Sequence, residues 1–91
     1  MTVTLEGYIQ VPEDRLDDVR TALVEHIKLT RAEPGCLRFE IVASQTKMGR
    51  FDVSEEFLNK AAFEAHQARV KSSDWGRITQ GIPRDYEISG L

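Results

Sequence analysis

The middle of the chain decides the fold: residues 36–57 read CLRFEIVASQTKMGRFDVSEEF. Apolar and polar side chains alternate before and after the polar segment 45–49, which ends in glycine. A period of two is typical of a strand with one buried face, and a polar segment with a glycine favours a turn. The stretch therefore predicts two consecutive strands, with Leu37 and Phe39 on one face of the first and Cys36 on the other.

A strand and a helix precede this pair. Residues 2–11 carry apolar side chains at the odd positions, which predicts a further strand. After Pro12, apolar residues recur at spacings of three and four. This spacing predicts an amphipathic helix that ends near Glu33, because Pro34 and the glycine after it cannot continue a helix.

Two more helical segments and a strand follow. Asn59 suits the N-cap of a short helix, a further helical turn contains Trp75, and residues 84–89 alternate again. The resulting order, β-α-β-β-α-β, is the split βαβ pattern. We therefore expect a single α+β domain over residues 1–91, with a ferredoxin-like antiparallel sheet.

The predicted sheet has two different faces. Helices would cover one of them, and the other carries Tyr8, Arg38 and Val42 beside threonine and glutamate side chains. This outer face is too mixed for a core, yet it is richer in large groups than a solvated surface requires. Because a domain of 91 residues buries a modest share of its own surface, we expect a homodimer in which two sheets pack face to face.

Composition excludes several classes of function. The chain has 12 basic and 15 acidic residues, and the scattered basic ones argue against nucleic acid as a partner. No apolar run approaches the roughly 18 residues of a membrane span, so we expect no membrane role. A single cysteine, Cys36, cannot form an internal disulfide, which favours a reducing cytoplasm.

The sequence lacks the common cofactor motifs. It contains no G-x-G-x-x-G, P-loop or C-x-x-C segment, so we expect no cofactor. The candidate metal ligands His26, His66 and Cys36 lie on three different predicted elements, without the close spacing that makes a metal motif specific, so we expect no metal. We interpret His26 as a boundary residue on the shoulder of its helix, and Cys36 as a small apolar residue.

His66 and Glu55 are the strongest candidates for chemistry. His66 lies in the middle of the apolar stripe of the second helix, and Glu55 interrupts the buried row of the third strand. A buried carboxylate is costly unless it is paired, and a Glu–His pair in an apolar cavity can orient the imidazole as a general base. The alternatives are a structural imidazole with one hydrogen bond, and a Glu55 that binds Arg38, Arg77 or a backbone amide.

Three segments resemble the antibiotic biosynthesis monooxygenase family, which includes small quinol monooxygenases. They are residues 33–40 (EPGCLRFE), 54–57 (SEEF) and 59–66 (NKAAFEAH). The resemblance covers nearly the whole chain and implies a ferredoxin-like fold whose sheets pair into a dimeric α/β barrel. Glu55 matches the acidic position of the family's E-x-W segment and His66 its helix histidine, whereas Phe57 stands in place of the usual tryptophan.

The resemblance also implies an activity, the oxygenation of quinol- or anthrone-like phenols by O₂ without flavin, metal or haem. A base removes a phenolic proton, the anion passes an electron to O₂, and an apolar cavity holds the radical pair until it combines. On this hypothesis His66 is the base and Glu55 orients it. Six aromatic residues are candidate walls that stack on the substrate: Phe39, Phe51, Phe57, Phe63, Trp75 and Tyr86.

Two other functions stay open. Relatives of this fold isomerise small phosphorylated sugar-like diketones, which requires positive charge, and Arg50, Arg77 and Arg84 would supply it if they converge. A non-catalytic, small-ligand-binding dimer is the third class, favoured by a pocket filled with Phe and Trp side chains. Haem binding is disfavoured, because the first strand lacks the asparagine of haem-degrading relatives and has Gly7 at its middle.

Overall fold

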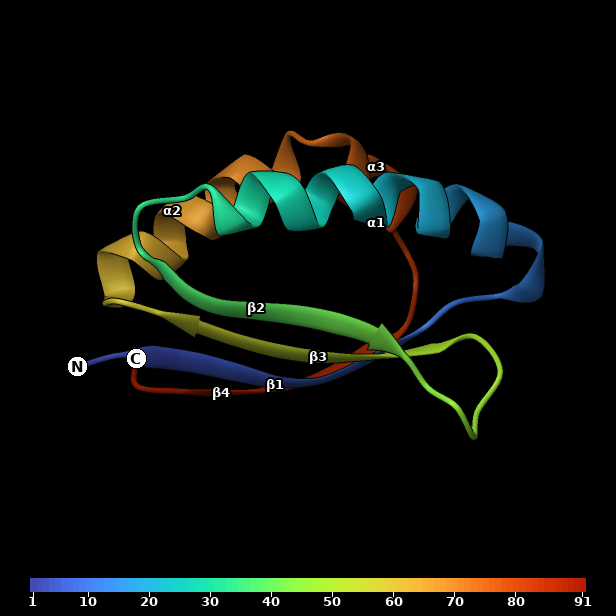
Figure 1. Cartoon of the computed structure of the whole chain (residues 1–91), viewed down its shortest axis with the longest axis horizontal. Helices are drawn as coiled ribbons and strands as arrows, with labels where there is room; N and C mark the ends of the chain where they lie inside the picture. The colour runs from blue at the N-terminus through green and yellow to red at the C-terminus, as the bar shows by residue number, and fades with distance from the viewer.

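A four-stranded sheet and a layer of helices make up the computed structural model, which describes residues 1–91 (Figure 1). The strands are β1 (Val3–Gln10), β2 (Cys36–Ala43), β3 (Arg50–Phe57) and β4 (Arg84–Ser89). The helices are α1 (Leu16–Arg31), which follows a 3₁₀ turn at Glu13–Arg15, then α2 (Lys60–Lys71) and α3 (Asp74–Ile78). The strands pair antiparallel in the order β2-β3-β1-β4, which confirms the ferredoxin-like α+β fold.

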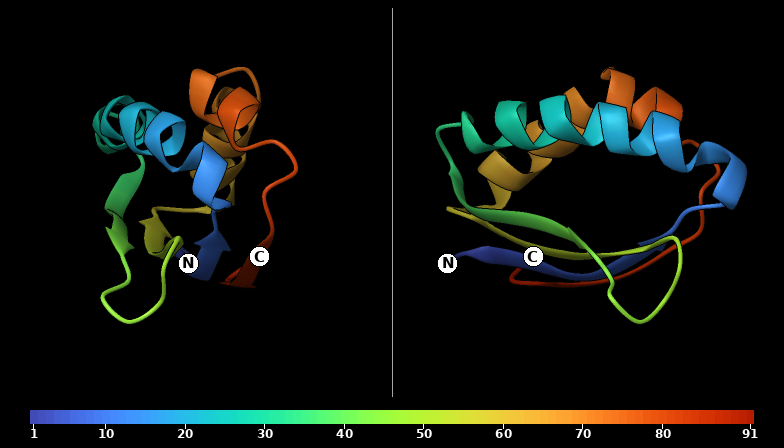
Figure 2. Two further views of the ribbon diagram at one scale, coloured as in Figure 1. Left: turned by 90° about the vertical axis from the view of Figure 1, so that its right-hand side faces the viewer. Right: turned by 45° about the vertical axis from the view of Figure 1, so that its right-hand side comes forward.

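The helices all lie on one face of the sheet (Figure 2). The core fills the space between the two layers. The core consists of two apolar clusters. One surrounds Phe51 and Trp75, and the other surrounds Phe57 and Phe63. Phe39 belongs to neither cluster and instead contacts two histidine rings, so a polar centre lies within the apolar core.

The start of β2 departs from the predicted alternation. Cys36 pairs with Phe57 and Arg38 with Glu56, so Leu37 is an extra residue in the ladder, a β-bulge. The bulge turns Cys36 toward the helices, where it packs on the Phe57 cluster, and leaves Leu37 53% exposed. The predicted faces of Leu37 and Cys36 are therefore wrong, because the extra residue shifts the alternation by one position.

The loop between α1 and β2 packs directly on α2. A Cβ atom added to Gly35 would lie 2.3 Å from the Cβ of Ala62, so a side chain at this position would collide with the helix. This contact brings the segment just before β2 against the first turns of α2. None of the helices is long and apolar enough to cross a membrane.

The outer face of the sheet carries charged pairs among exposed apolar groups. Arg38 binds Glu56 with an N···O distance of 3.0 Å, and the guanidinium of Arg50 lies 4.0 Å from the centre of the Tyr8 ring. Val42 is 58% exposed among them. The sheet-to-sheet dimer expected for this face stays a prediction.

Candidate active site

His66 is held on the buried side of α2. The helix begins after Asn59, whose Oδ1 accepts a hydrogen bond from the backbone N–H of Ala62 at 2.9 Å, and this cap sets which residues face the sheet. The His66 side chain is 3% exposed, and its ring centre lies 4.7 Å from that of Phe57 and 5.8 Å from that of Phe39. The imidazole is therefore packed among aromatic rings between the helix and the sheet.

Glu33 makes the hydrogen bond that orients this imidazole. The Nδ1 of His66 lies 3.1 Å from Oε1 of Glu33. Because a carboxylate accepts hydrogen bonds, we assign the ring proton to Nδ1, which leaves the lone pair on Nε2. Burial lowers the pKa of His66, and the nearby charge of Arg69 lowers it as well, although the hydrogen bond and charge of Glu33 act in the opposite direction. The ring is accordingly a neutral base near pH 7.

Glu55 faces the other ring nitrogen. Its Oε1 lies 3.9 Å from Nε2 of His66, too far for a hydrogen bond, and has no other hydrogen-bond partner. Burial raises the pKa of Glu55 to about 7, with smaller contributions from the negative charges of Glu33 and Glu6. Glu55 and His66 thus lie close together, as expected, but without a hydrogen bond between them. The hydrogen bond that orients the imidazole comes from Glu33.

Arg69 joins α2 to the end of α1. Its Nε donates to Oε2 of Glu33 at 2.6 Å, and its Nη2 donates to Oγ1 of Thr30 at 2.9 Å. The third nitrogen, Nη1, is buried and has no partner. Sequence reasoning missed both Glu33 and Arg69, although Arg69 follows His66 by three residues on the same side of α2 and Glu33 opens the EPGC segment.

His26 is a core residue, and its interpretation as a boundary residue is wrong. It is 4% exposed, and its ring stacks on Trp75 with centres 4.6 Å apart and an angle of 3° between the planes. The ring also meets Phe39 edge-on at 5.2 Å and lies 6.1 Å from His66. His26 is buried because α3 places Trp75 over the side of α1 that carries His26. The spacing of apolar residues within α1 predicts a boundary position there, since it contains no information about α3.

The environment keeps His26 uncharged. Burial lowers the pKa of this imidazole to about 3, and the charge of His66, when that ring is protonated, and the positive charge of Arg69 add to the effect. Its Nδ1 is buried without a hydrogen-bond partner. His26 therefore offers one donor and one acceptor nitrogen at ordinary pH.

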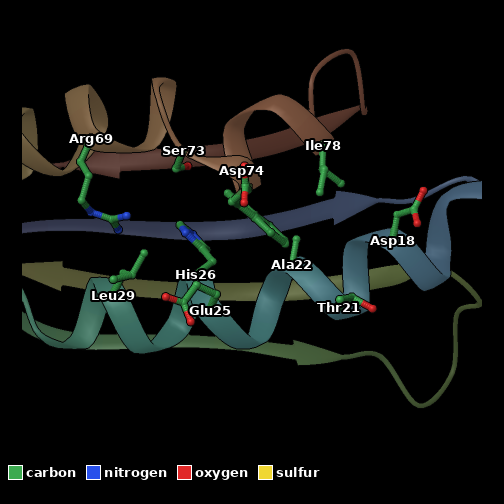
Figure 3. Close-up of a pocket in the computed structure, with 11 residues that line it drawn as sticks. Asp18, Thr21, Ala22, Glu25, His26, Leu29, Arg69, Ser73, Asp74 and Ile78 are labelled. Carbon is green, nitrogen blue, oxygen red and sulfur yellow. The ribbon is translucent and has the colours of Figure 1, made fainter.

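A groove of about 590 Å³ opens between α1 and α3 beside these residues (Figure 3). His26, Arg69 and Trp75 belong to its lining. Trp75 is the one predicted wall residue that borders this groove, since Phe39 and Phe57 contact His66 instead. The structure thus places Phe39 and Phe57 in the packed surroundings of His66 and Trp75 at an open groove.

The remaining predicted walls lie in the core. Phe63 and Phe57 pack edge to face with their ring centres 5.7 Å apart, and Phe51 is buried in the cluster with Trp75. Tyr86 is half-buried and packs against both clusters. Burial raises the pKa of the Tyr86 hydroxyl to about 12, so this phenol stays protonated.

The three arginines proposed for a phosphate site do not converge. Arg77 and Arg84 border one polar hollow together with Lys71, whereas Arg50 binds Asp52 at 2.8 Å on the outer face of the sheet. The structure also contains no group of three or more His, Cys, Asp or Glu side chains placed to hold a metal ion.

Known proteins share this sequence pattern and fold. A family model described as antibiotic biosynthesis monooxygenase matches residues 2–77. A solved structure from Nitrosomonas europaea, described as a candidate antibiotic biosynthesis monooxygenase, is 26% identical with a TM-score of 0.79, covering 100% of this chain and 98% of that one. No curated protein sequence matches significantly.

Two further structures show likeness of fold at lower identity. SnoaB from Streptomyces nogalater, described as a cofactor-independent oxygenase, is 11% identical with a TM-score of 0.80, covering 99% of this chain and 92% of that chain. A candidate antibiotic biosynthesis monooxygenase from Caulobacter crescentus CB15 is 16% identical with a TM-score of 0.76, covering 99% and 89%. At these identities the likeness concerns the fold alone.

Proposed function

This chain belongs to the antibiotic biosynthesis monooxygenase family, and on that premise we propose that it oxidises quinol- or anthrone-like phenols with O₂ and without a cofactor. The observation that carries the proposal is the state of His66. Its neutral imidazole is buried between Phe39 and Phe57, and its Nδ1 proton is bound by the carboxylate of Glu33. An imidazole held in this way presents Nε2 as a general base.

The chemistry uses this base in the first step. Nε2 of His66 accepts the phenolic proton, and the resulting anion gives one electron to O₂. The substrate radical and superoxide combine to form a carbon–oxygen bond. In an anthrone the peroxide then loses water as its CH₂ carbon becomes a carbonyl, so CH₂ and O₂ give C=O and H₂O. In a quinol the oxygen is added at a ring C–H carbon, so the quinol and O₂ give a hydroxyquinone and H₂O. In both cases the substrate is the only reductant.

Two carboxylates support the charge that develops on His66. Glu33 is a positioning residue, because it binds Nδ1 and keeps the ring in one tautomer. Glu55 lies 3.9 Å from Nε2 and, when ionised, attracts the imidazolium that proton transfer creates. Because the pKa of Glu55 is raised by burial to about 7, this carboxyl can release or take up a proton near neutral pH.

Substrate access involves a movement of side chains. His66 is 3% exposed, so a phenol reaches Nε2 when the groups that cover it shift. The groove between α1 and α3 adjoins the site, since His26 at its lining lies 6.1 Å from the His66 ring. We propose that substrates enter through this groove.

Oxygen uptake tests the function. Wild-type protein and His66→Ala are compared in an oxygen electrode over a series of quinols, anthrones and catechols, with circular dichroism to verify folding. Loss of a general base lowers rates by about 100-fold or more, and the exposed neighbour on α2, in Gln67→Ala, serves as a matched control that keeps the wild-type rate. A folded His66→Ala variant with unchanged uptake contradicts the assignment, and no uptake with any phenol favours the isomerase or binding-module alternatives.

We also propose that two copies pair through the outer face of the sheet. The exposed Val42, and the Arg50 guanidinium stacked on Tyr8, give this face the mixture of apolar and charged groups found at interfaces. Sedimentation at micromolar concentration is expected to show a dimer, and Val42→Asp to shift it toward the monomer. A wild-type monomer under these conditions contradicts the proposal.

The cellular setting that we propose is a reducing cytoplasm. Cys36 is the single cysteine and is free, so the fold gains nothing from an oxidising compartment. Thiol labelling of the protein as isolated from cells is expected to find Cys36 reduced, and a Cys36-linked disulfide would contradict this setting.

A further inference from the structure

The groove between α1 and α3 contains two buried groups that lack hydrogen-bond partners. They are Nδ1 of His26 and Nη1 of Arg69, and both residues line the groove. Figure 3 shows the two side chains extending toward each other from opposite sides, His26 from α1 and Arg69 from α2. Because buried polar groups in native proteins almost always have a partner, an atom from outside the chain is the natural candidate.

The two groups together select an oxygen atom. Arg69 cannot turn away, since its Nε is bound to Glu33 and its Nη2 to Thr30, so Nη1 is presented in a fixed direction and can only donate. His26 is neutral, is stacked on Trp75, and can donate from one nitrogen and accept at the other. A carbonyl or hydroxyl oxygen satisfies both side chains at once.

The charges around the groove disfavour an anion. Asp18, Glu25 and Asp74 border it, while the positive charge of Arg69 already faces the carboxylate of Glu33 at 2.6 Å. A carboxylate or phosphate ligand would meet three negative groups with no free cation in the lining to balance them. An uncharged ligand avoids this repulsion.

The size and the apolar part of the lining suit a ring system. The groove has a volume of about 590 Å³, within the range of about 300–1,000 Å³ found for small-molecule sites. Ala22, Leu29 and Ile78 supply apolar surface beside Trp75. This surface can cover the faces of one or two fused rings whose oxygen points to Arg69 and His26.

We propose that this groove binds an uncharged fused-ring molecule through a single carbonyl or hydroxyl oxygen, held by Nη1 of Arg69 and the imidazole of His26. The two residues then act as specificity-determining groups, distinct from the base His66. The identification of this ligand with a substrate rests on the proposed function, but the binding site itself can be measured without any oxygenation.

The probe for the test is α-tetralone, a fused-ring ketone that has no phenolic proton to lose. Its hydrocarbon analogue tetralin lacks the oxygen, and 1-naphthoate adds a negative charge. The readout is the NMR signal of the indole N–H of Trp75, the single tryptophan of the chain and a residue of the groove. We expect α-tetralone to shift this signal in a saturable way. Tetralin and 1-naphthoate are each expected to bind more weakly than α-tetralone by about tenfold or by a larger factor.

Two variants locate the oxygen. His26→Phe keeps a ring against Trp75 and removes both nitrogens, and Arg69→Lys keeps the charge and removes Nη1. Each is expected to weaken α-tetralone binding by about tenfold, because each removes one of the two proposed hydrogen bonds to the ketone oxygen. Arg20→Lys, an exposed arginine on the same helix as His26, is the matched control and is expected to bind like the wild type.

The outcomes separate this site from the proposed function. Equal binding of tetralin or 1-naphthoate, or α-tetralone binding that neither variant changes, would overturn the site. If one variant fails to fold, the comparison of the three probes on the wild type still decides. If the protein binds α-tetralone but consumes no O₂ with any phenol, the binding site is supported and the oxygenase function is contradicted. If it oxygenates phenols but does not bind α-tetralone, the oxygenase function is supported and the binding site is contradicted.

Discussion

Replacing Glu55 by glutamine is expected to stabilise the protein above pH 7 and to leave it almost unchanged at pH 4.5. The carboxyl is buried, and its Oε1 has no hydrogen-bond partner. Glutamine has nearly the shape of the protonated carboxyl and cannot ionise. The substitution therefore removes one buried titratable group and preserves the packing of this side chain against His66.

The magnitude follows from the pKa of Glu55, which burial raises from its ordinary value of 4.5 to about 7. Between these two pH values the folded chain keeps a proton that the unfolded chain has lost, so the wild type loses stability as pH rises. One pKa unit corresponds to about 1.4 kcal/mol, which gives a loss of about 3 kcal/mol across this window. The Glu55→Gln variant is spared that loss.

Urea denaturation at several pH values between 5 and 8 measures the effect. The difference in unfolding free energy between variant and wild type is the quantity to plot, because the titrations of His26 and His66 contribute to both proteins and largely cancel. Glu56→Gln is the matched control, since Glu56 is the next residue on β3 and binds Arg38 on the outer face. Its effect is expected to stay below about 1 kcal/mol and to change little with pH.

Two results would refute the reasoning about Glu55. A difference that stays flat from pH 5 to 8 would mean that the carboxyl titrates as if exposed to solvent. A wild type that grows more stable than the variant with rising pH would mean that the ionised carboxylate is paired, most directly with a protonated His66.

Three further substitutions test other parts of the structure. Gly35→Ala is expected to cost about 1–3 kcal/mol in thermal denaturation because its Cβ would lie 2.3 Å from that of Ala62, and an unchanged melting temperature would contradict this close packing. Asn59→Ala removes the cap of α2 and is expected to cost about 1 kcal/mol, whereas a neutral effect would mean that the cap contributes nothing. Because burial lowers the pKa of His26 from 6.5 to about 3, the unfolded chain protonates first, and His26 should contribute a loss of about 3 kcal/mol between pH 6.5 and 4.5, measured as the wild type relative to His26→Phe. His26→Phe should lack this acid-dependent loss, and equal acid sensitivity of the two proteins in urea denaturation would show that His26 is not buried as a neutral ring.

Local patterns predict most of the fold. The period of two in residues 50–57 makes β3 a strand with one buried face, and Phe51, Val53, Glu55 and Phe57 all prove to be buried on it. The spacing of three and four predicts α1 and α2, and Pro34 with Gly35 ends the first helical segment close to the observed end at Arg31. These features are accessible because each depends on residues within one or two turns of the chain, so periodicity alone carries the information.

The polar centre of the site needs the packed molecule. His66 and Glu33 are 33 positions apart, and no local pattern indicates that the end of α1 comes to lie beside α2. His26 becomes a buried neighbour of His66 because α3 places Trp75 on it, and Cys36 turns inward because Leu37 bulges out of the ladder. Glu55 and His66 could be named from their own elements, since each interrupts an apolar row. Which carboxylate binds the imidazole depends on whether it lies 3.1 Å away, as Glu33 does, or 3.9 Å away, as Glu55 does, and these distances between separate elements arise from tertiary packing.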